Sequence, residues 1–136
     1  MVYALDTNTI IRFLHNDTNV CHKFNNAVMV GYKIVVPKMT DYEIRRGFHI
    51  KPNPRKEVYY KTLLEDCAIM EIDADTLDYA IPIYEGHYHN RHTADEMDIL
   101  IAALCIQNDY TLVTNNAKDY KGVGGLKWVD WTQAEA

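Results

Sequence analysis

Short apolar runs alternate with longer segments of helical periodicity along the chain. The apolar runs lie at residues 2–5, 34–36, 68–72, 111–114 and 127–129. Each run is brief and largely apolar throughout, rather than alternating between apolar and polar positions. Such runs are typical of strands that are buried on both faces, as in a parallel sheet covered by helices.

The segments between these runs predict helices. Residues 17–30 are the clearest, because Val20, Phe24 and Ala27 recur at helical spacing and Gly31 can close the helix. Pro82 should kink the helix predicted at 75–88, and residues 86–92 form a polar, histidine-rich connection. The other predicted helices cover residues 10–14, 40–46 or beyond, 54–66 and 93–108, with Thr7, Asn8 and Thr9 as candidate caps of the first and Thr93 as the cap of the last.

This order of strands and helices predicts an α/β fold. We expect a three-layer α/β/α sandwich around a short, mainly parallel central sheet, formed by a single domain over residues 1–136. In sheets of this kind, functional side chains gather at the carboxyl ends of the strands. Residues that directly follow a strand are therefore the first candidates for chemistry.

The charge of the chain narrows the functional classes. Its formal net charge of −5 argues against a protein held on nucleic acid by bulk electrostatics. An enzyme that acts on nucleic acid through a metal is still compatible with this charge, since metal-binding acids add negative charge themselves.

The three cysteines are widely spaced and form no CxxC pair, so we expect reduced thiols rather than a zinc site. With no apolar run of about 18 residues and no signal peptide, we expect no membrane span and a cytoplasmic location.

Polar side chains fall at the predicted carboxyl edge of the sheet. Asp6 follows the first strand, Glu43 lies in the first turn of the helix after the second strand, and Asn116 follows the strand at 111–114. Asp98 lies near the start of the helix that leads into that strand. Carboxylates at close range need a cation to remain ionised together. Oxygen ligands alone suit Mg²⁺ or Mn²⁺ rather than zinc.

Several acids also have purely structural interpretations. Taken alone, Thr40 and Glu43 form the pattern of a capping box. Negative charge is favoured near a helix N-terminus, and acids are common in caps and turns. These alternatives apply to the Thr93–Glu96 pair, Asp6, Asp95 and Asp119.

Asp98 is the acid that is hardest to explain structurally. It stands between Met97 and Ile99, at the front of a long apolar run. Aspartate is a poor helix former and is rarely buried without a partner. Its partner is therefore a salt bridge, the solvent at an exposed helix edge, or a cation shared with other acids.

Four motifs together resemble the PIN-domain ribonucleases, and more narrowly the VapC-type toxins of toxin–antitoxin pairs. The resemblance covers nearly the whole chain, and its strength lies in the order of the motifs in a chain of this size. The motifs are Leu5-Asp6-Thr7-Asn8, Glu43-Ile44-Arg45-Arg46-Gly47, Asp98-Ile99-Leu100-Ile101-Ala102-Ala103 and Leu112-Val113-Thr114-Asn115-Asn116.

The resemblance implies a metal-dependent endoribonuclease. Asp6, Glu43 and Asp98 would bind one or two Mg²⁺ ions, for which Mn²⁺ can substitute. Asn116 holds the place at which many relatives have a fourth acid, and would add a metal-binding oxygen without charge. A metal-activated water would then cleave RNA and leave a 5′-phosphate and a 3′-hydroxyl. The residues implied in support of this centre are Asn8, Thr114 and Asp95.

The resemblance also implies partners. The substrate would be a transfer, ribosomal or messenger RNA, and relatives are usually homodimers whose active site is covered by a cognate antitoxin. By analogy, the apolar face of the helix at 17–30 and the segment at 54–66 are candidate docking surfaces. The stretch at 86–92 is a further candidate for contact with RNA. The basic candidates for substrate binding are Arg12, Arg46 and Lys118.

Two other functions remain open on the sequence alone. A phosphotransfer domain, either receiver-like or a haloacid-dehalogenase-like phosphatase, also places Asp after an early strand and binds Mg²⁺. The phosphatase motif needs Asp where this chain has Asn8, and the acid pair of a receiver is missing. A non-enzymatic binding module of the same fold would use the acids as caps and ion pairs. The presence of Asp6, Glu43 and Asp98 together favours the nuclease.

Overall fold

The central sheet is entirely parallel in the computed structural model, which describes residues 1–91, 95–120 and 122–134. Its strand order is β3-β2-β1-β4-β5. Each adjacent pair of strands is parallel, which confirms the expected fold class. The strands are β1 (Val2–Leu5), β2 (Lys33–Pro37), β3 (Ala68–Met70), β4 (Thr111–Val113) and β5 (Lys127–Val129).

The helices lie close to the predicted segments. They are α1 (Thr7–Leu14), α2 (Thr18–Val30), α3 (Lys38–Ile50), α4 (Pro54–Glu65), α5 (Ala74–His89), α6 (Glu96–Asn108) and the short 3₁₀ helix η1 (Ala117–Tyr120). Local signals explain two of these boundaries. Asp17 caps α2 and Gly31 ends it in the left-handed conformation, with φ of 91°. Pro54 opens α4 after the capping residue Asn53.

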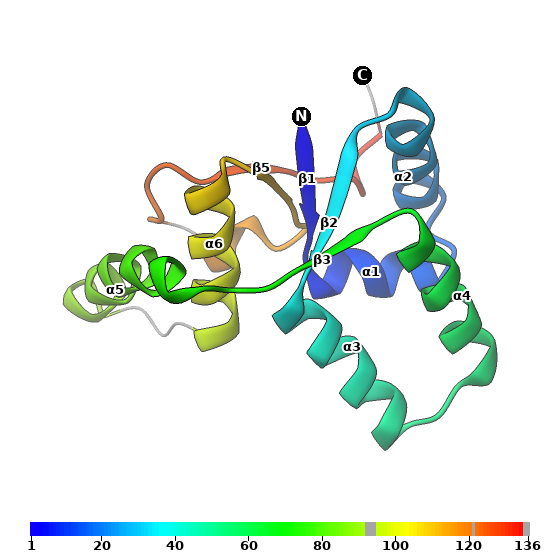
Figure 1. Cartoon of the computed structure of the whole chain (residues 1–136), viewed down its shortest axis with the longest axis horizontal. Helices are drawn as coiled ribbons and strands as arrows, with labels where there is room; N and C mark the ends of the chain where they lie inside the picture. Colours follow the sequence, from blue (N-terminus) through cyan, green and yellow to red (C-terminus); the bar gives the residue numbers. More distant parts are fainter. Residues whose placement is uncertain (92–94, 121, 135–136) are drawn as a thin grey trace.

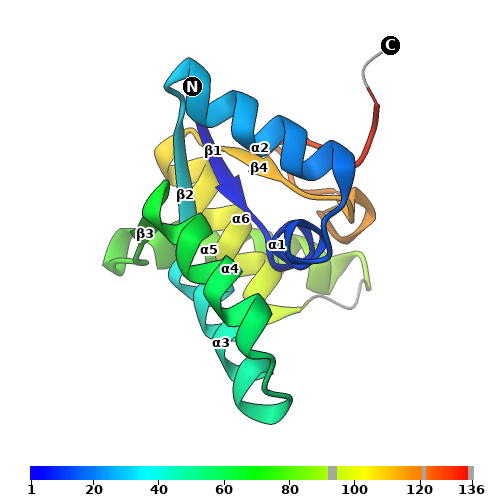
Figure 2. The ribbon, with the colours of Figure 1, turned by 90° about the vertical axis from the view of Figure 1, so that its right-hand side faces the viewer.

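Helices cover both faces of the sheet (Figures 1 and 2). On one face Leu5, Ile34 and Val36 pack with buried side chains of α1, α2 and α4. On the other face Ala4, Val35 and Leu112 pack against α6, and α5 forms the outer cover of α6. Alternate residues of the inner strands therefore enter two separate cores, which explains why the strands are largely apolar rather than alternating.

The strand order creates a switch point between β1 and β4. From β1 the chain moves outward through β2 to β3, then crosses back to place β4 on the other side of β1. Leu5 is in register with Val113, so Asp6 and Thr114 leave neighbouring strands side by side. Binding sites of open parallel sheets form at such switch points, beyond the carboxyl ends of the strands.

Some helix boundaries and caps differ from the prediction. The cap of α1 is Asp6, whose Oδ1 accepts a hydrogen bond from the Thr9 backbone N–H at 2.8 Å, so Thr7 and Asn8 are helix residues rather than caps. α3 begins at Lys38, which places Thr40 inside the helix. Asp95 caps α6, while the predicted cap Thr93 lies outside the described residues.

Two predictions are wrong. The sequence predicts a connection at 86–92, but most of this stretch is the end of α5; residue 92 lies outside the described part of the chain. The helix continues through Pro82, and Ile83 on its inner side packs against α6. The apolar face of α2 is unsuitable for docking, because Val20, Phe24 and Ala27 are buried in the core of the protein itself.

Within the described residues, no helix is long and apolar enough to cross a membrane.

Candidate active site

Asp6 is the most buried acid at the switch point, with 4% of its surface exposed. Its backbone N–H donates to the carbonyl of Val113 at 3.1 Å, which extends the pairing of β1 with β4 beyond the strand ends. The hydroxyl of Thr9 donates to the same carbonyl at 2.9 Å. These bonds hold the start of α1 on the end of β4, so the Asp6 carboxylate occupies a fixed position.

Burial raises the pKa of the Asp6 carboxyl. The Thr114 hydroxyl and the Thr9 backbone N–H stabilise the ionised form and lower the pKa, while the charge of Asp119 raises it further. Thr114 is fully buried beside Asp6. A cation close to Asp6 would relieve the combined effect of burial and neighbouring negative charge.

Glu43 faces the same region from α3. Its Oε1 accepts a hydrogen bond from the Thr7 hydroxyl at 2.9 Å, and Nη2 of Arg46 lies 3.8 Å from Oε2. The predicted capping box with Thr40 is wrong, because the hydroxyl of Thr40 donates instead to the Leu5 carbonyl at 3.3 Å. Thr40 and Glu43 therefore connect α3 to the end of β1 and the start of α1, rather than capping α3.

Asp98 has its pKa raised to about 6. The largest cause is burial, followed by the negative charges of Asp95 and Asp119 and, more weakly, of Glu43. The hydroxyl of Tyr120 donates to Oδ1 of Asp98 at 3.3 Å and lowers the pKa. Within the described residues Asp98 forms no salt bridge, and the Tyr120 hydroxyl is the side-chain group that donates to it.

Asp119 belongs to this cluster although the sequence pattern indicated only a solvated turn. It is exposed on η1, yet its charge raises the pKa of both Asp6 and Asp98. The available signal was its neighbour Tyr120, an aromatic residue in an otherwise polar segment. Tyr120 is buried against α6 and thereby brings η1, with Asp119, over the carboxyl edge.

The remaining predicted residues surround the cluster. The backbone N–H of Asn116 donates to the Thr114 hydroxyl at 3.0 Å, which places Asn116 immediately beyond β4. Asp95 caps α6 and accepts a hydrogen bond from the Met97 backbone N–H at 2.8 Å. Arg12 lies 3.5 Å from Asp17 across the end of α1. Lys118 is exposed on η1, and Asn8 lies in the first turn of α1.

The donor set fits a hard divalent cation in its chemistry. The cluster offers the carboxylates of Asp6, Glu43, Asp98 and Asp119, which suit Mg²⁺ or Mn²⁺. Over residues 1–91, 95–120 and 122–134, however, no three His, Cys, Asp or Glu side chains converge into a complete metal-binding group. The charges of these acids therefore influence one another, although their side chains are not arranged as a complete set of metal ligands.

Comparisons with known proteins agree with this fold. The chain is 22% identical over 138 residues to Ribonuclease VapC1 of Haemophilus influenzae strain R2866, and the match covers 98% of this chain and 100% of the relative. The fold is similar to that of VapBC2 from Rickettsia felis bound to a DNA fragment from its promoter, with a TM-score of 0.87 and 21% identity. The match covers 96% of this chain and 99% of the Rickettsia felis chain. FitAcB from Neisseria gonorrhoeae is similar with a TM-score of 0.82, 18% identity and coverage of 98% and 100%.

A family model gives the assignment directly. The model of the PIN domain matches residues 3–125, from β1 to the segment just before β5. The matched region contains the whole switch point and every acid of the cluster described above. The chain therefore belongs to the PIN domain family.

Proposed function

We propose that this chain is a Mg²⁺-dependent endoribonuclease and the toxin of a toxin–antitoxin pair. The observation that carries the proposal is the acid cluster at the β1–β4 switch point, where Asp6 and Asp98 both have raised pKa values under neighbouring negative charge. Perturbed carboxylates gathered at such an edge are typical of functional sites. The curated relatives named as ribonucleases support RNA as the substrate.

Asp6, Glu43, Asp98 and Asp119 are the residues that would hold the cation. When bound, Mg²⁺ would supply a Lewis acid for the scissile phosphate and lower the pKa of a water molecule. The protein holds three of these acids by hydrogen bonds. Thr9 and Thr114 hold Asp6. The Thr7 hydroxyl donates to Glu43, and the Tyr120 hydroxyl donates to Asp98. Such supporting bonds keep ligand carboxylates ionised and oriented. The expected products carry a 5′-phosphate and a 3′-hydroxyl.

Three basic side chains are proposed to bind the RNA backbone. Arg46 already lies beside Glu43 and has a largely exposed side chain, so it can turn towards a phosphate once a cation neutralises the acid. Arg12 on α1 and Lys118 on η1 lie to the sides of the cluster. Because the chain as a whole carries a net charge of −5, these local contacts must replace a broad basic surface.

A cognate antitoxin is proposed to occupy the groove beside Glu43. This groove of about 450 Å³ lies between α1, α3 and α4, and Ile11, Leu14 and Phe48 form its apolar part. The structural neighbours include VapBC proteins, and one of them, VapBC-5 from Mycobacterium tuberculosis, is a member of the VapBC family of toxin–antitoxin systems. An antitoxin segment with apolar side chains and one basic side chain would fill the groove and neutralise Glu43, which would block the site.

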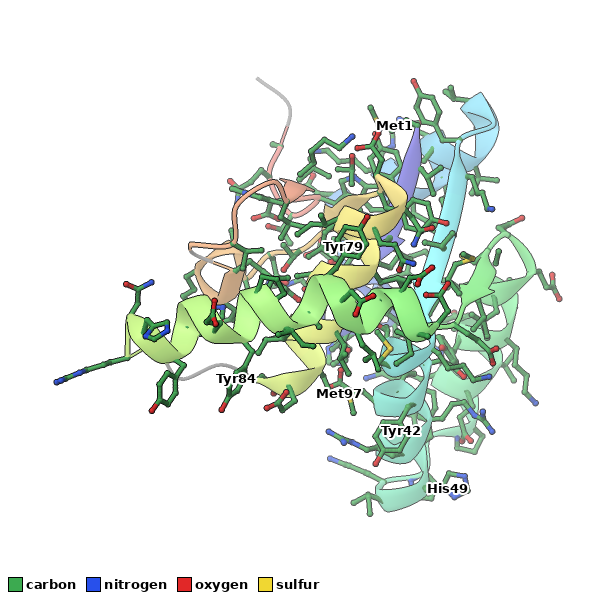
Figure 3. The ribbon with its side chains drawn as sticks, turned by 60° about the vertical axis from the view of Figure 1, so that its left-hand side comes forward. Met1, Tyr42, His49, Tyr79, Tyr84 and Met97 are labelled. Carbon is green, nitrogen blue, oxygen red and sulfur yellow. The ribbon has the colours of Figure 1, made fainter. Side chains whose placement is uncertain are left out.

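We further propose a homodimer formed through the faces of α3 and α5. Exposed apolar side chains gather there, and Figure 3 shows Tyr42, Tyr84 and Met97 on this side of the molecule. A hollow of about 450 Å³ lies between Tyr42 and Met97 on this surface and could receive a side chain of the second copy. Apolar patches of this kind usually mark a protein interface. Light scattering after size exclusion should give a dimer for the native chain and a monomer for Ile81→Glu, which places a charge on the exposed face of α5.

The direct test is cleavage of total cellular RNA by the purified chain. The reactions contain Mg²⁺, Mn²⁺ or EDTA, and Asp98→Asn is the matched variant. Discrete products that require the metal and disappear in the variant support the proposal. A folded, inhibitor-free chain that cleaves no RNA, but releases phosphate from a phosphate monoester, would favour the phosphotransfer function. Neither activity would favour a binding module.

A further inference from the structure

The groove beside Glu43 extends well beyond the acid cluster. It runs along α1 and α3, and Thr7 and Glu43 line it where these two helices meet at the cluster. Both helices continue away from there, and the residues that follow their last turns, His15 and Lys51, also line the groove. From Thr7 to His15, α1 rises by about 12 Å. The groove therefore has an acidic end at the cluster and a far end that the acids do not reach.

A lysine and a histidine are in contact at the far end. Nζ of Lys56, in the first turn of α4, lies 2.8 Å from Nε2 of His15, and this contact is exposed to solvent. An ammonium group can only donate, so the neutral imidazole of His15 accepts at Nε2 and carries its proton on Nδ1. The ammonium has three N–H groups and therefore keeps two for another partner. The far end of the groove is thus an exposed source of hydrogen-bond donors.

The positive charge at this end is not explained by the stability of α4. A helix dipole favours acids rather than bases in the first turn, where Lys56 lies. The exposed Lys51 lines the same end of the groove and adds a second ammonium. Two like charges in one groove repel each other, and an anion between them removes this repulsion. Such a gathering of positive charge in a chain of net charge −5 indicates an anionic ligand.

A phosphate of an RNA strand fits this end of the groove. Phosphate oxygens only accept hydrogen bonds, so they match donors on Lys56 and Lys51. Proteins bind single-stranded nucleic acid with positive charge along the backbone and apolar surface for the bases. The middle of the groove supplies apolar surface through Ile11, Leu14 and Phe48. An acidic protein side chain would also match the donors, but a nucleic-acid strand supplies a phosphate for each end of the groove.

We propose that Lys56, Lys51 and His15 bind one non-scissile phosphate of the RNA backbone, about 12 Å along the groove from the acid cluster. This site aligns the strand across the acids and contributes to RNA binding rather than to the chemical step. The inference rests on the proposed ribonuclease function, because the same strand must enter the acid cluster. The proposed antitoxin occupies the same groove and therefore competes with the strand at both ends.

The test measures RNA binding without cleavage. The cleavage-deficient Asp98→Asn protein is titrated with fluorescently labelled single-stranded RNA of random sequence at a series of KCl concentrations. Adding Lys56→Gln keeps a donor towards His15 but removes the charge. It should reduce the slope of log K against log [KCl] by about 0.7, the value for one phosphate contact with a single strand. Lys56→Arg keeps the charge and should keep the slope.

Lys33→Gln is the matched control. Lys33 is exposed at the amino end of β2, at the opposite edge of the sheet from the acid cluster. This variant removes the same charge from the chain as Lys56→Gln does, so it separates a local contact from a change in net charge. Its slope should equal that of the Asp98→Asn protein alone.

The outcomes separate this inference from the proposed function. A slope that falls in Lys56→Gln and is kept in Lys56→Arg and Lys33→Gln supports the phosphate site. An unchanged slope in Lys56→Gln, an equal fall in Lys33→Gln, or no binding of RNA overturns it. An unchanged slope with a lower melting temperature would assign the Lys56–His15 contact to the packing of α4 on α1. Cleavage of RNA by the native chain is scored separately, so the ribonuclease can stand when the phosphate site fails. If the native chain cleaves no RNA, the proposed function itself fails.

Discussion

Replacing Asp98 by Asn should stabilise the metal-free protein at neutral pH. The substitution keeps an oxygen that can accept the hydrogen bond of the Tyr120 hydroxyl, but it removes the charge. That charge is disfavoured by burial and by the neighbouring charges of Asp95, Asp119 and Glu43. A residue kept for chemistry at the expense of stability behaves in this way, whereas a residue of a structural ion pair does the opposite.

The magnitude follows from the pKa of Asp98, which is about 6 in place of the ordinary 3.8. A difference of that size corresponds to about 3 kcal/mol against the ionised form. Asp98 is partly exposed, so solvent screening reduces the expected effect to about 1 kcal/mol. For a chain of this length, that gain raises the melting temperature by about 3 °C.

The pH dependence of stability is a second test of whether the charge of Asp98 destabilises the folded protein. Because the folded-state pKa is raised, the penalty from Asp98 in the native chain is small below about pH 4, grows as the pH rises from about 4 to about 6, and levels off above that. The native chain and Asp98→Asn should therefore differ in free energy of unfolding above pH 6 and become equal near pH 4. Urea denaturation in EDTA at both pH values measures this, with Asp78→Asn on the exposed side of α5 as a control. A clear destabilisation by Asp98→Asn at pH 7.5 would refute the reasoning.

Three further predictions follow from the same geometry. Mg²⁺ at 100 times its dissociation constant should raise the free energy of unfolding of the native chain by about 2.7 kcal/mol, and that of Asp6→Asn by much less, in melting curves with and without EDTA. Asp119→Asn should lower the rate of RNA cleavage by about 10- to 100-fold without lowering the melting temperature, since its charge acts on Asp6 and Asp98; an unchanged rate would remove Asp119 from the site. Tyr60→Phe removes the hydroxyl that donates to the buried Asp41 at 2.7 Å, and should lower the free energy of unfolding by about 1–3 kcal/mol in urea titrations.

The features predicted correctly from the sequence are those with local causes. The central strands could be located because they are buried on both faces and are therefore largely apolar. The end of α2 followed from Gly31, which takes a left-handed conformation that other residues avoid. Asp6 and Asn116 could be placed at one edge because the carboxyl ends of parallel strands coincide.

The features that the sequence did not reveal depend on contacts between distant segments. Thr40 and Glu43 match a capping box in sequence, but their partners are Leu5 and Thr7, more than 30 residues away in the chain. Asp119 joins the cluster only because Tyr120 is buried against α6. No local pattern distinguishes a capping glutamate from one that a remote hydroxyl orients, so these contacts needed the structure.

The chemical ends of the RNA products test the central claim most directly. The claim is that the acids at the β1–β4 switch point form a metal-dependent hydrolytic centre. RNA cleaved by the native chain in Mg²⁺ should carry 5′-phosphate and 3′-hydroxyl ends, and EDTA should abolish the cleavage. Products with 2′,3′-cyclic phosphate and 5′-hydroxyl ends, or cleavage that persists in EDTA, would contradict the account, because the 2′-hydroxyl rather than a metal-activated water would then be the nucleophile.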